Sequence, residues 1–260
     1  RLRVWGSVGF IVGVVGIGPV LDRHGVSGLP WWLAGLLALL TLVALRLPAV
    51  AAAPRARASV SIGQRLAEPR VRAFFLSAFL MLFAHAALYA FFSLYLAARG
   101  YSKTAIGLVW ALGVLAEIAV FWLQRGLFQR FGALPLLRAS LAVAALRFLL
   151  IGASAGWLPA ILLAQLAHAV TFGIHHSATI ATLQEWFEPP QHARAQALYV
   201  MVGYGLGGSA GVLVASWVWT AVSPDATFVV AGLAAGLGWL ALRRVVPSGA
   251  PDGRVRNGDR

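Results

Sequence analysis

Eight apolar segments, each close to the length of a membrane span, follow one another along the 260 residues of this chain. A helix needs roughly 20 apolar residues to cross a hydrocarbon core about 30 Å thick. The alternating segments of about ten residues that a membrane barrel requires do not occur. The sequence therefore predicts an all-α fold, a polytopic transmembrane helical bundle. The expected spans are Val4–Leu21, Pro30–Leu47, Ala73–Ala97, Thr104–Leu123, Leu134–Ala153, Leu158–Trp186, Gln196–Val222 and Ala226–Leu242.

The composition excludes most soluble classes of protein. Hydrophobic residues make up 60% of the chain and charged residues 11%, whereas soluble domains carry about 25% charged residues. Cysteine is absent, which excludes a disulfide scaffold and a thiolate metal site. The sequence contains no phosphate-binding P-loop and no HExxH zinc motif. We therefore expect a protein that is not an enzyme and that binds neither a cofactor nor a metal.

The basic residues are distributed unevenly between the two sides of the predicted bundle. The formal net charge is +13, and when successive gaps between spans are assigned to alternate sides, 17 basic residues fall on one side and 3 on the other. The positive-inside rule produces this asymmetry, and a nucleic-acid-binding protein has no reason to show it. We expect a multi-pass protein of a bacterial inner membrane, with both ends of this segment in the cytoplasm and no nucleic-acid partner. The larger set is Arg1, Arg3, Arg46, Arg55, Arg57, Arg65, Arg70, Arg72, Arg125, Arg130, Arg138, Arg194, Arg243, Arg244, Arg254, Arg256 and Arg260, and the smaller set is Arg23, Arg99 and Lys103.

Two residues stand out within the predicted spans, where a charged group is costly unless it is paired or hydrated. Glu117 falls in the fourth span and Arg147 in the fifth. At 1.5 Å of rise per residue their depths differ by about 10 Å, so a direct salt bridge requires a shift of the helices or a long reach by Arg147. One interpretation is a structural ion pair between neighbouring helices. The other is a carboxyl group that takes up and releases a proton as the arginine approaches and withdraws.

The sixth span carries a polar stripe along most of its length. Its members are spaced three or four residues apart and fall within an arc of roughly 120°, so the stripe faces the bundle interior or a water-filled cavity. Hydrogen bonding between helices accounts equally well for the threonines. His168 lies near the middle of the span and can change its charge near neutral pH, which favours a cavity role. The stripe consists of Gln165, His168, Thr171, His175, Thr179 and Thr182.

Two further helices show patterns that suggest a lined cavity and close packing. In the third span His85 and Tyr89 lie one helical turn apart, and Trp110 is the tryptophan that lies clearly inside a span. Phe92, on the next turn of the third span, is better explained as core. Glycines four residues apart let helix backbones approach closely. They are Gly9 and Gly13 in the first span and Gly203, Gly207 and Gly211 in the seventh.

Several short segments carry a family resemblance. The opening Arg1–Phe10 reads RLRVWGSVGF and is similar to the start of the fifth helix in the lactose permease and phenylpropionate permease branches of the major facilitator superfamily. Gly18–Gly25 looks like a loop signature of the same carriers, but the charges place it on the outer side, so it carries no weight. The phenylpropionate-type branch is further resembled by His85–Tyr89, by Gly100–Ser102 with Ile106–Trp110, by Val114–Glu117, and by His168–Gly173 ahead of His175.

The resemblance implies a chain that begins at helix five of twelve. Residues 1–47 would be the last two helices of the N-terminal half, 48–70 a cytoplasmic connector, 71–245 the six-helix C-terminal half and 246–260 a cytoplasmic tail. The start at Arg1, directly before a span, agrees with missing upstream helices. The family places its substrate site between the halves near the middle of the membrane, and access alternates as the halves rock. We expect a monomer when the protein is complete.

The resemblance also assigns roles to single residues. Arg3 matches an arginine that contacts substrate in the lactose permease, Arg147 matches a ninth-helix arginine tied to proton coupling, and His168 lies near a tenth-helix histidine of the same relay. The acidic residue expected three positions after that histidine is Thr171 here, and Glu117 sits later in its helix than the lactose permease's carboxylate. These departures put a sugar substrate in doubt and favour the phenylpropionate-like pattern.

The combined expectation is a secondary active transporter that couples protons to a small organic solute such as an aromatic carboxylate. Its partners would be this substrate, protons and the lipid bilayer. The alternatives are a proton symporter for nucleosides or oligosaccharides, a non-transporting sensor or assembly factor, and a nonfunctional fragment. We expect proton coupling by Glu117, Arg147 and His168, and substrate binding by Arg3, His85, Tyr89, Trp110, Thr171 and His175.

Overall fold

The computed structural model describes residues 2–47 and 61–245, with side chains from residue 5 onward. The tail predicted at 246–260 and most of the predicted connector lie outside the described residues. All regular elements within the described ranges are helical, which confirms the predicted fold class. Within the described ranges, seven helical segments are long and apolar enough to cross a membrane: Trp5–His24, Pro69–Ala97, Lys103–Phe131, Ala133–Ala153, Leu158–Trp186, Pro189–Ala221 and Pro224–Leu242.

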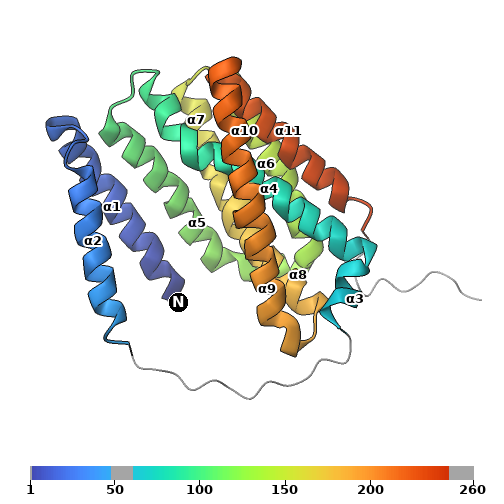
Figure 1. Ribbon diagram of the computed structural model, residues 1–260. Coiled ribbons are helices and arrows are strands. Elements are labelled where there is room, and N and C mark those ends of the chain that lie inside the picture. Colours follow the sequence, from blue (N-terminus) through green and yellow to red (C-terminus); the bar gives the residue numbers. More distant parts are fainter. Residues whose placement is uncertain (1, 48–60, 246–260) are drawn as a thin grey trace, which may run out of the picture.

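Figure 1 shows the helices coloured in chain order, from blue near the N-terminus to red near the C-terminus. Several helices have a proline in the first turn, which suits the start of a helix. Several have a serine cap, whose side chain accepts a hydrogen bond from a free N–H group of the first turn. The elements are α1 (Leu2–His24), α2 (Leu29–Ala44), α3 (Ile62–Ala67), α4 (Pro69–Ala97), α5 (Lys103–Phe131), α6 (Ala133–Ala153), α7 (Leu158–Leu166), η1 (Ala169–Ile174), α8 (His175–Trp186), η2 (Pro189–Gln191), α9 (His192–Tyr199), η3 (Val200–Gly207), α10 (Gly208–Ala221) and α11 (Pro224–Leu242).

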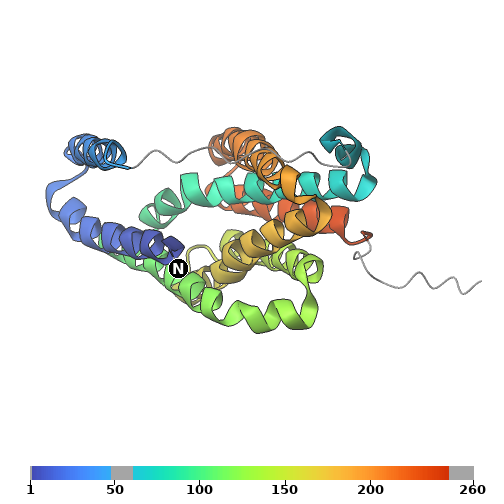
Figure 2. The same cartoon turned by 90° about the horizontal axis from the view of Figure 1, so that it is seen from below.

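The second predicted span is shorter than expected. The sequence predicts a span over Pro30–Leu47, whereas α2 is a 16-residue apolar helix that ends at Ala44. None of its residues is buried. It stands at the edge of the molecule on the far side of α1 from the rest of the bundle (Figures 1 and 2). Its apolar side chains are therefore exposed, as lipid-facing or partner-facing residues are.

The remaining helices form a tightly packed bundle. Helix α11 packs against both α4 and α6, and η3 and α10 pack along α4. A methyl group on Gly207 would overlap the carbonyl oxygen of Phe79, and one on Gly211 would overlap that of Phe83. The predicted close packing at these glycines is thus confirmed. Gly9 and Gly13 have no atom of another described element within 4 Å of the position of an added methyl group, so for them close packing stays a prediction.

Two predicted spans contain π-helical turns that the sequence did not indicate. Residues Ala169–Ile174 form η1 in the sixth predicted span, and Val200–Gly207 form η3 in the seventh. A π-helical turn inserts an extra residue into a helix and so rotates the side chains that follow it. Such turns occur frequently at functional sites.

Helix α1 joins the bundle through α5, and the backbones approach most closely toward one end. A methyl group on Gly18 would lie 2.9 Å from the Cα atom of Thr104, and Gly107 contacts the backbone of Val14. The Asp22 carboxylate caps the start of α5: it accepts hydrogen bonds from the backbone N–H groups of Lys103 and Thr104, both 2.9 Å long. It also accepts one from the Thr104 hydroxyl, 2.6 Å long. We call this end of the bundle the capped end, and the other, where α1 and α4 begin, the basic end.

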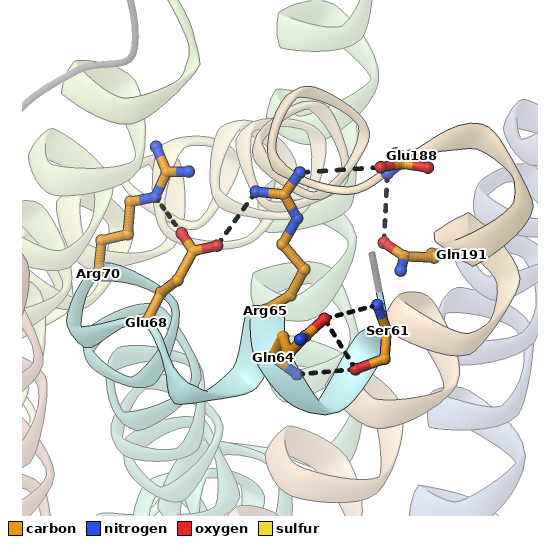
Figure 3. A network of polar contacts seen from close by, with 7 residues as sticks. All are labelled: Ser61, Gln64, Arg65, Glu68, Arg70, Glu188 and Gln191. Carbon is orange, nitrogen blue, oxygen red and sulfur yellow. Dashed lines mark hydrogen bonds and ion pairs between the residues drawn. The ribbon is translucent and has the colours of Figure 1, made fainter. Parts of the chain in front are cut away.

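At the basic end, the short helix α3 is held by ion pairs (Figure 3). Ser61 and Gln64 cap its first turn in a reciprocal capping box. Arg65 of α3 pairs with Glu68 at 3.1 Å and reaches Glu188, at the end of α8, at 3.9 Å. Glu68 also pairs with Arg70 at 2.8 Å. The described part of the predicted connector is therefore fixed to the helices beneath it.

Candidate functional site

Two glycines let α5 approach the helix that carries the polar stripe. Gly113 of α5 lies against the backbone of Gln165 and the Cβ atom of His168. Gly173 of η1 makes room for the side chain of Glu117, whose Cγ atom would be 3.2 Å from a methyl group at that position. As a result, Oε2 of Glu117 and Nε2 of His168 lie 3.9 Å apart. Both residues are buried, with exposed fractions of 5% and 4%.

Arg147 lies behind His168 and is 2% exposed. Its guanidinium group donates to four acceptors on the sixth predicted span. They are the Ala164 carbonyl at 2.6 Å, Gln165 Oε1 at 2.7 Å, Thr171 Oγ1 at 2.9 Å and His168 Nδ1 at 3.2 Å. Arginine carries five N–H donors in a planar fork, so this arrangement uses most of them and fixes the orientation of α6 against α7 and η1.

The contact with Arg147 determines the tautomer of His168. Arginine only donates hydrogen bonds, so Nδ1 of His168 must be the acceptor. The neutral ring therefore carries its hydrogen on Nε2, which faces Glu117. Glu117, His168 and Arg147 thus form a series, with the imidazole between the carboxyl group and the guanidinium group. The sequence predicts that Glu117 and Arg147 lie at different depths in the membrane. An imidazole between the two side chains is consistent with this prediction.

A cavity of about 330 Å³ lies against the Glu117 end of this series. Tyr89 and Trp110 stack on one another there, with ring centroids 6.1 Å apart and planes inclined by 10°. The Trp110 Nε1–H group donates to Ser93 Oγ at 3.0 Å, which fixes the indole. The cavity thus combines an aromatic wall with one carboxyl group and one imidazole. Its lining residues are Gly6, Ser7, Phe10, Tyr89, Trp110, Val114, Glu117, His168 and Phe172.

The structure divides the predicted site residues into two layers. Four line the cavity: Tyr89, Trp110, Glu117 and His168. Four others do not line the cavity, and the side chain of one more lies outside the described residues. Arg147, Thr171, His85 and His175 are buried, with exposed fractions of 1% to 4%. Arg3 belongs to α1, but its side chain lies outside the described part of the chain.

The polar stripe is confirmed as a single buried face. All six of its members have exposed fractions of 4% or less. The site also contains residues that the sequence did not single out. The Phe172 ring stacks on His168, with centroids 5.2 Å apart and planes inclined by 7°, and Phe10 makes an edge contact with Trp110. The spacing of four residues between His168 and Phe172 is a signal that could have found the first of these.

Comparisons with known proteins agree with this architecture. A family model described as the MFS_1 like family matches residues 1–230. The chain is 32% identical over 216 residues to a protein of Escherichia coli (strain K12) named "Probable 3-phenylpropionic acid transporter", a match that covers 82% of this chain and 56% of that protein. The chain thus spans little more than half the length of this relative.

Solved structures share the fold. A mutant form of the nucleoside transporter NupG matches with a TM-score of 0.71 at 18% identity, and a second NupG structure matches with a TM-score of 0.68 at 17% identity. Each match covers 92% of this chain and 65% of NupG. With its seven helices of spanning length, the chain is a multi-pass membrane protein that belongs to the MFS_1 like family, within the major facilitator superfamily of transporters.

Proposed function

We propose that the complete protein is a secondary active transporter that carries a small aromatic carboxylate together with a proton, by alternating access. The observation that supports this most strongly is the composition of the cavity wall. It combines four aromatic rings with the carboxyl group of Glu117 and the imidazole of His168. This wall offers a flat apolar surface for an aromatic ring and a carboxyl group for a proton.

The aromatic part of the wall suits a planar substrate. Tyr89 and Trp110 are nearly parallel, and Phe10 and Phe92 hold the indole by edge contacts. Stacked and edge-to-face ring pairs stabilise one another by about 1 kcal/mol beyond the burial of their surface. A substrate ring therefore finds a preorganised face. The name of the relative from Escherichia coli, a 3-phenylpropionic acid transporter, supports the same chemical class.

Glu117 is the proposed proton carrier. An ionised carboxyl group beside the cavity repels an anionic substrate, whereas a protonated one accepts it without charge repulsion. Proton and substrate therefore bind together and leave together, which is the requirement for symport. Nε2 of His168 lies 3.9 Å from the carboxyl group of Glu117, and the contact of Nδ1 with Arg147 leaves the ring hydrogen on Nε2.

The substrate carboxylate needs a positive partner, and we assign it to Arg3. In α1 this residue precedes Gly6, Ser7 and Phe10 by three, four and seven positions, and those three residues line the cavity. Residues with this spacing share one face of a helix. Arg147 is the alternative partner, but its guanidinium group already donates to four acceptors.

The arrangement of α1 and α5 fits one state of an alternating-access cycle. The two helices are closed at the capped end, around Asp22 and Thr104, and the cavity lies farther along them toward the basic end. We propose that the basic end faces the cytoplasm of a bacterial inner membrane, by the positive-inside rule. The structure then corresponds to the form that is closed to the outside. We further propose that residues 1–47 and 71–245 belong to different halves of one monomeric carrier.

A nucleoside is the second candidate substrate. A nucleobase is also flat and would stack on Tyr89 and Trp110, and the fold is shared with the nucleoside transporter NupG. An uncharged nucleoside, however, gains nothing from an arginine partner. Substrate charge therefore separates the two candidates.

The proposal is tested by substrate-induced alkalinisation of the medium, in cells that express the protein from its complete gene. We expect 3-phenylpropionate to produce alkalinisation and uridine and lactose to produce none. Trp110→Leu should raise the half-saturating concentration about tenfold, as expected for the loss of a stacking contact worth about 1.4 kcal/mol. Trp122→Leu is the matched control, because Trp122 lies on the same helix with an exposed fraction of 72%. Alkalinisation by uridine alone would replace the proposal with the nucleoside carrier, and no response to any solute would contradict transport.

A further inference from the structure

His85 and His175 each have one ring nitrogen for which the described residues provide no hydrogen-bond partner. Nδ1 of His85 lies 3.0 Å from the Met81 carbonyl oxygen, and Nδ1 of His175 lies 2.9 Å from Ser140 Oγ. The Nε2 atoms of both rings are buried without a partner among the described residues. A buried polar atom without a partner costs about 1–3 kcal/mol. Each of these two atoms therefore needs a hydrogen-bond partner other than the described side chains.

The printed partners fix the tautomers of both rings. The Met81 carbonyl can only accept, so Nδ1 of His85 carries the hydrogen. The Ser140 hydroxyl donates its one hydrogen to the Leu137 carbonyl at 2.7 Å, so it accepts from Nδ1 of His175. Each neutral ring consequently presents a lone pair on Nε2. A molecule that partners both Nε2 atoms must donate a hydrogen bond to each of them.

Both histidines line the same small cavity, together with Thr171. The room open to the centre of a water molecule there is about 10 Å³, which is close to the minimum for one water. Thr171 Oγ1 accepts a hydrogen bond from Arg147, and its own hydrogen remains available to donate. A buried water typically makes about three hydrogen bonds. His176, Tyr199 and Tyr204 also line this space. The two histidine acceptors and the Thr171 donor match the hydrogen bonds of one water molecule.

We propose that this cavity binds one water molecule, which donates a hydrogen bond to Nε2 of His85 and to Nε2 of His175 and accepts one from the Thr171 hydroxyl. The water links α4, which carries His85, to α8, which carries His175. Through Thr171 it continues the hydrogen-bond network of Arg147 on α6. Three helices are thus joined behind the wall of the substrate cavity. The inference does not depend on which solute is carried.

The most direct test is an experimental structure of the complete protein at a resolution that shows ordered waters. We expect one density peak about 2.7–3.2 Å from all three atoms, retained when Zn²⁺ or Cu⁺ is added. Ring nitrogen NMR of the ¹⁵N-histidine-labelled protein should show Nδ1-protonated neutral rings at positions 85 and 175. A dry cavity, rings protonated on Nε2, or a metal bound in place of the water would each overturn the proposal.

Variants give a second readout that does not rely on transport. In Thr171→Ser the hydroxyl is kept and the water peak should remain. His175→Phe removes one acceptor, so we expect the peak to be lost and the Nε2 resonance of His85 to shift. His192→Phe is the control: His192 Nε2 bonds the Phe187 carbonyl in the loop at the basic end, so its loss should leave the resonance of His85 unchanged. An unshifted His85 resonance in a folded His175→Phe protein would contradict the shared water.

Discussion

Nε2 of His168 lies 3.9 Å from Oε2 of Glu117, and it carries the hydrogen of the neutral ring because Nδ1 accepts from Arg147. One side chain thus connects a group that can change its protonation state to a guanidinium group that holds two helices together. A proton on Glu117 removes the charge that the imidazole N–H faces. The proposed proton coupling would therefore act on the packing of η1 against α5 and α6.

The buried guanidinium group of Arg147 should dominate the stability of the six-helix bundle. Arg147→Met leaves four acceptors without their donor, and we expect a loss of about 3 kcal/mol of unfolding free energy. Arg147→Lys keeps the charge but not the planar fork, so it should recover only part of this loss. Thermal unfolding in detergent measures both. Arg194→Met, at an exposed position of α9, should change stability by less than about 0.5 kcal/mol, and an equal loss there would contradict the assignment.

The close approach of α10 to α4 predicts a position-specific effect of added volume. Gly211→Val places methyl groups against the Phe83 carbonyl oxygen and the Cβ atom of Ala86, so we expect a destabilisation of about 2 kcal/mol. Gly208→Val is the control on the same helix, because no described atom lies within 4 Å of an added methyl group. Both variants change helix propensity equally. If their unfolding temperatures fall together, packing against α4 is not the cause.

The closure of α1 on α5 predicts that a cross-link at the capped end stops transport. The chain has no native cysteine, and the side-chain oxygens of Asp22 and Thr104 lie 2.6 Å apart. Cysteines at both positions should therefore form a disulfide on mild oxidation. We expect uptake to be lost on oxidation and restored by reduction, relative to the reduced double variant. Full uptake by the cross-linked protein would show that this contact does not open during the cycle.

The docking of α3 should depend on acid pH. The hydrogen bond from Arg70, together with that from Arg65, holds the pKa of Glu68 below its ordinary value. A carboxyl group with a lowered pKa stabilises the folded state above its unfolded pKa of about 4.3, and this stabilisation is lost as the pH falls through the lowered value. We expect about 0.5 kcal/mol, present at pH 7 and lost below about pH 4. In Glu68→Gln this part of the pH profile should disappear, whereas Glu185→Gln, at an exposed position of α8, should keep it.

The helices were predictable because apolar length alone identifies a membrane span. Their relative rotation was not predictable from periodicity. The π-helical turns η1 and η3 depend on backbone hydrogen bonds that no residue pattern encodes here, and η1 contributes a side chain to the cavity. Phe172 joins the wall within η1. The shorter α2 also differs from expectation, because Leu45 and Leu47 continue the apolar run beyond the end of the helix.

For the site, the sequence identified the polar groups but not their partners. A charged group inside a span is rare, so Glu117 and Arg147 were conspicuous. That His168 lies between them depends on the glycines at positions 113 and 173, which set the distance between α5 and the sixth span. His85 packs against Phe148 and His175 is bonded to Ser140, both of which belong to α6. Such contacts are long-range and are not visible in a single span.

The central claim is that Glu117 carries the coupled proton, and one measurement tests it most directly. The complete protein and its Glu117→Gln variant are reconstituted in liposomes, and uptake of 3-phenylpropionate is measured with and without an imposed pH gradient. We predict that the variant exchanges substrate at equilibrium but does not accumulate it when the gradient is applied, while the wild type does. Accumulation by Glu117→Gln that still follows the pH gradient would contradict the account.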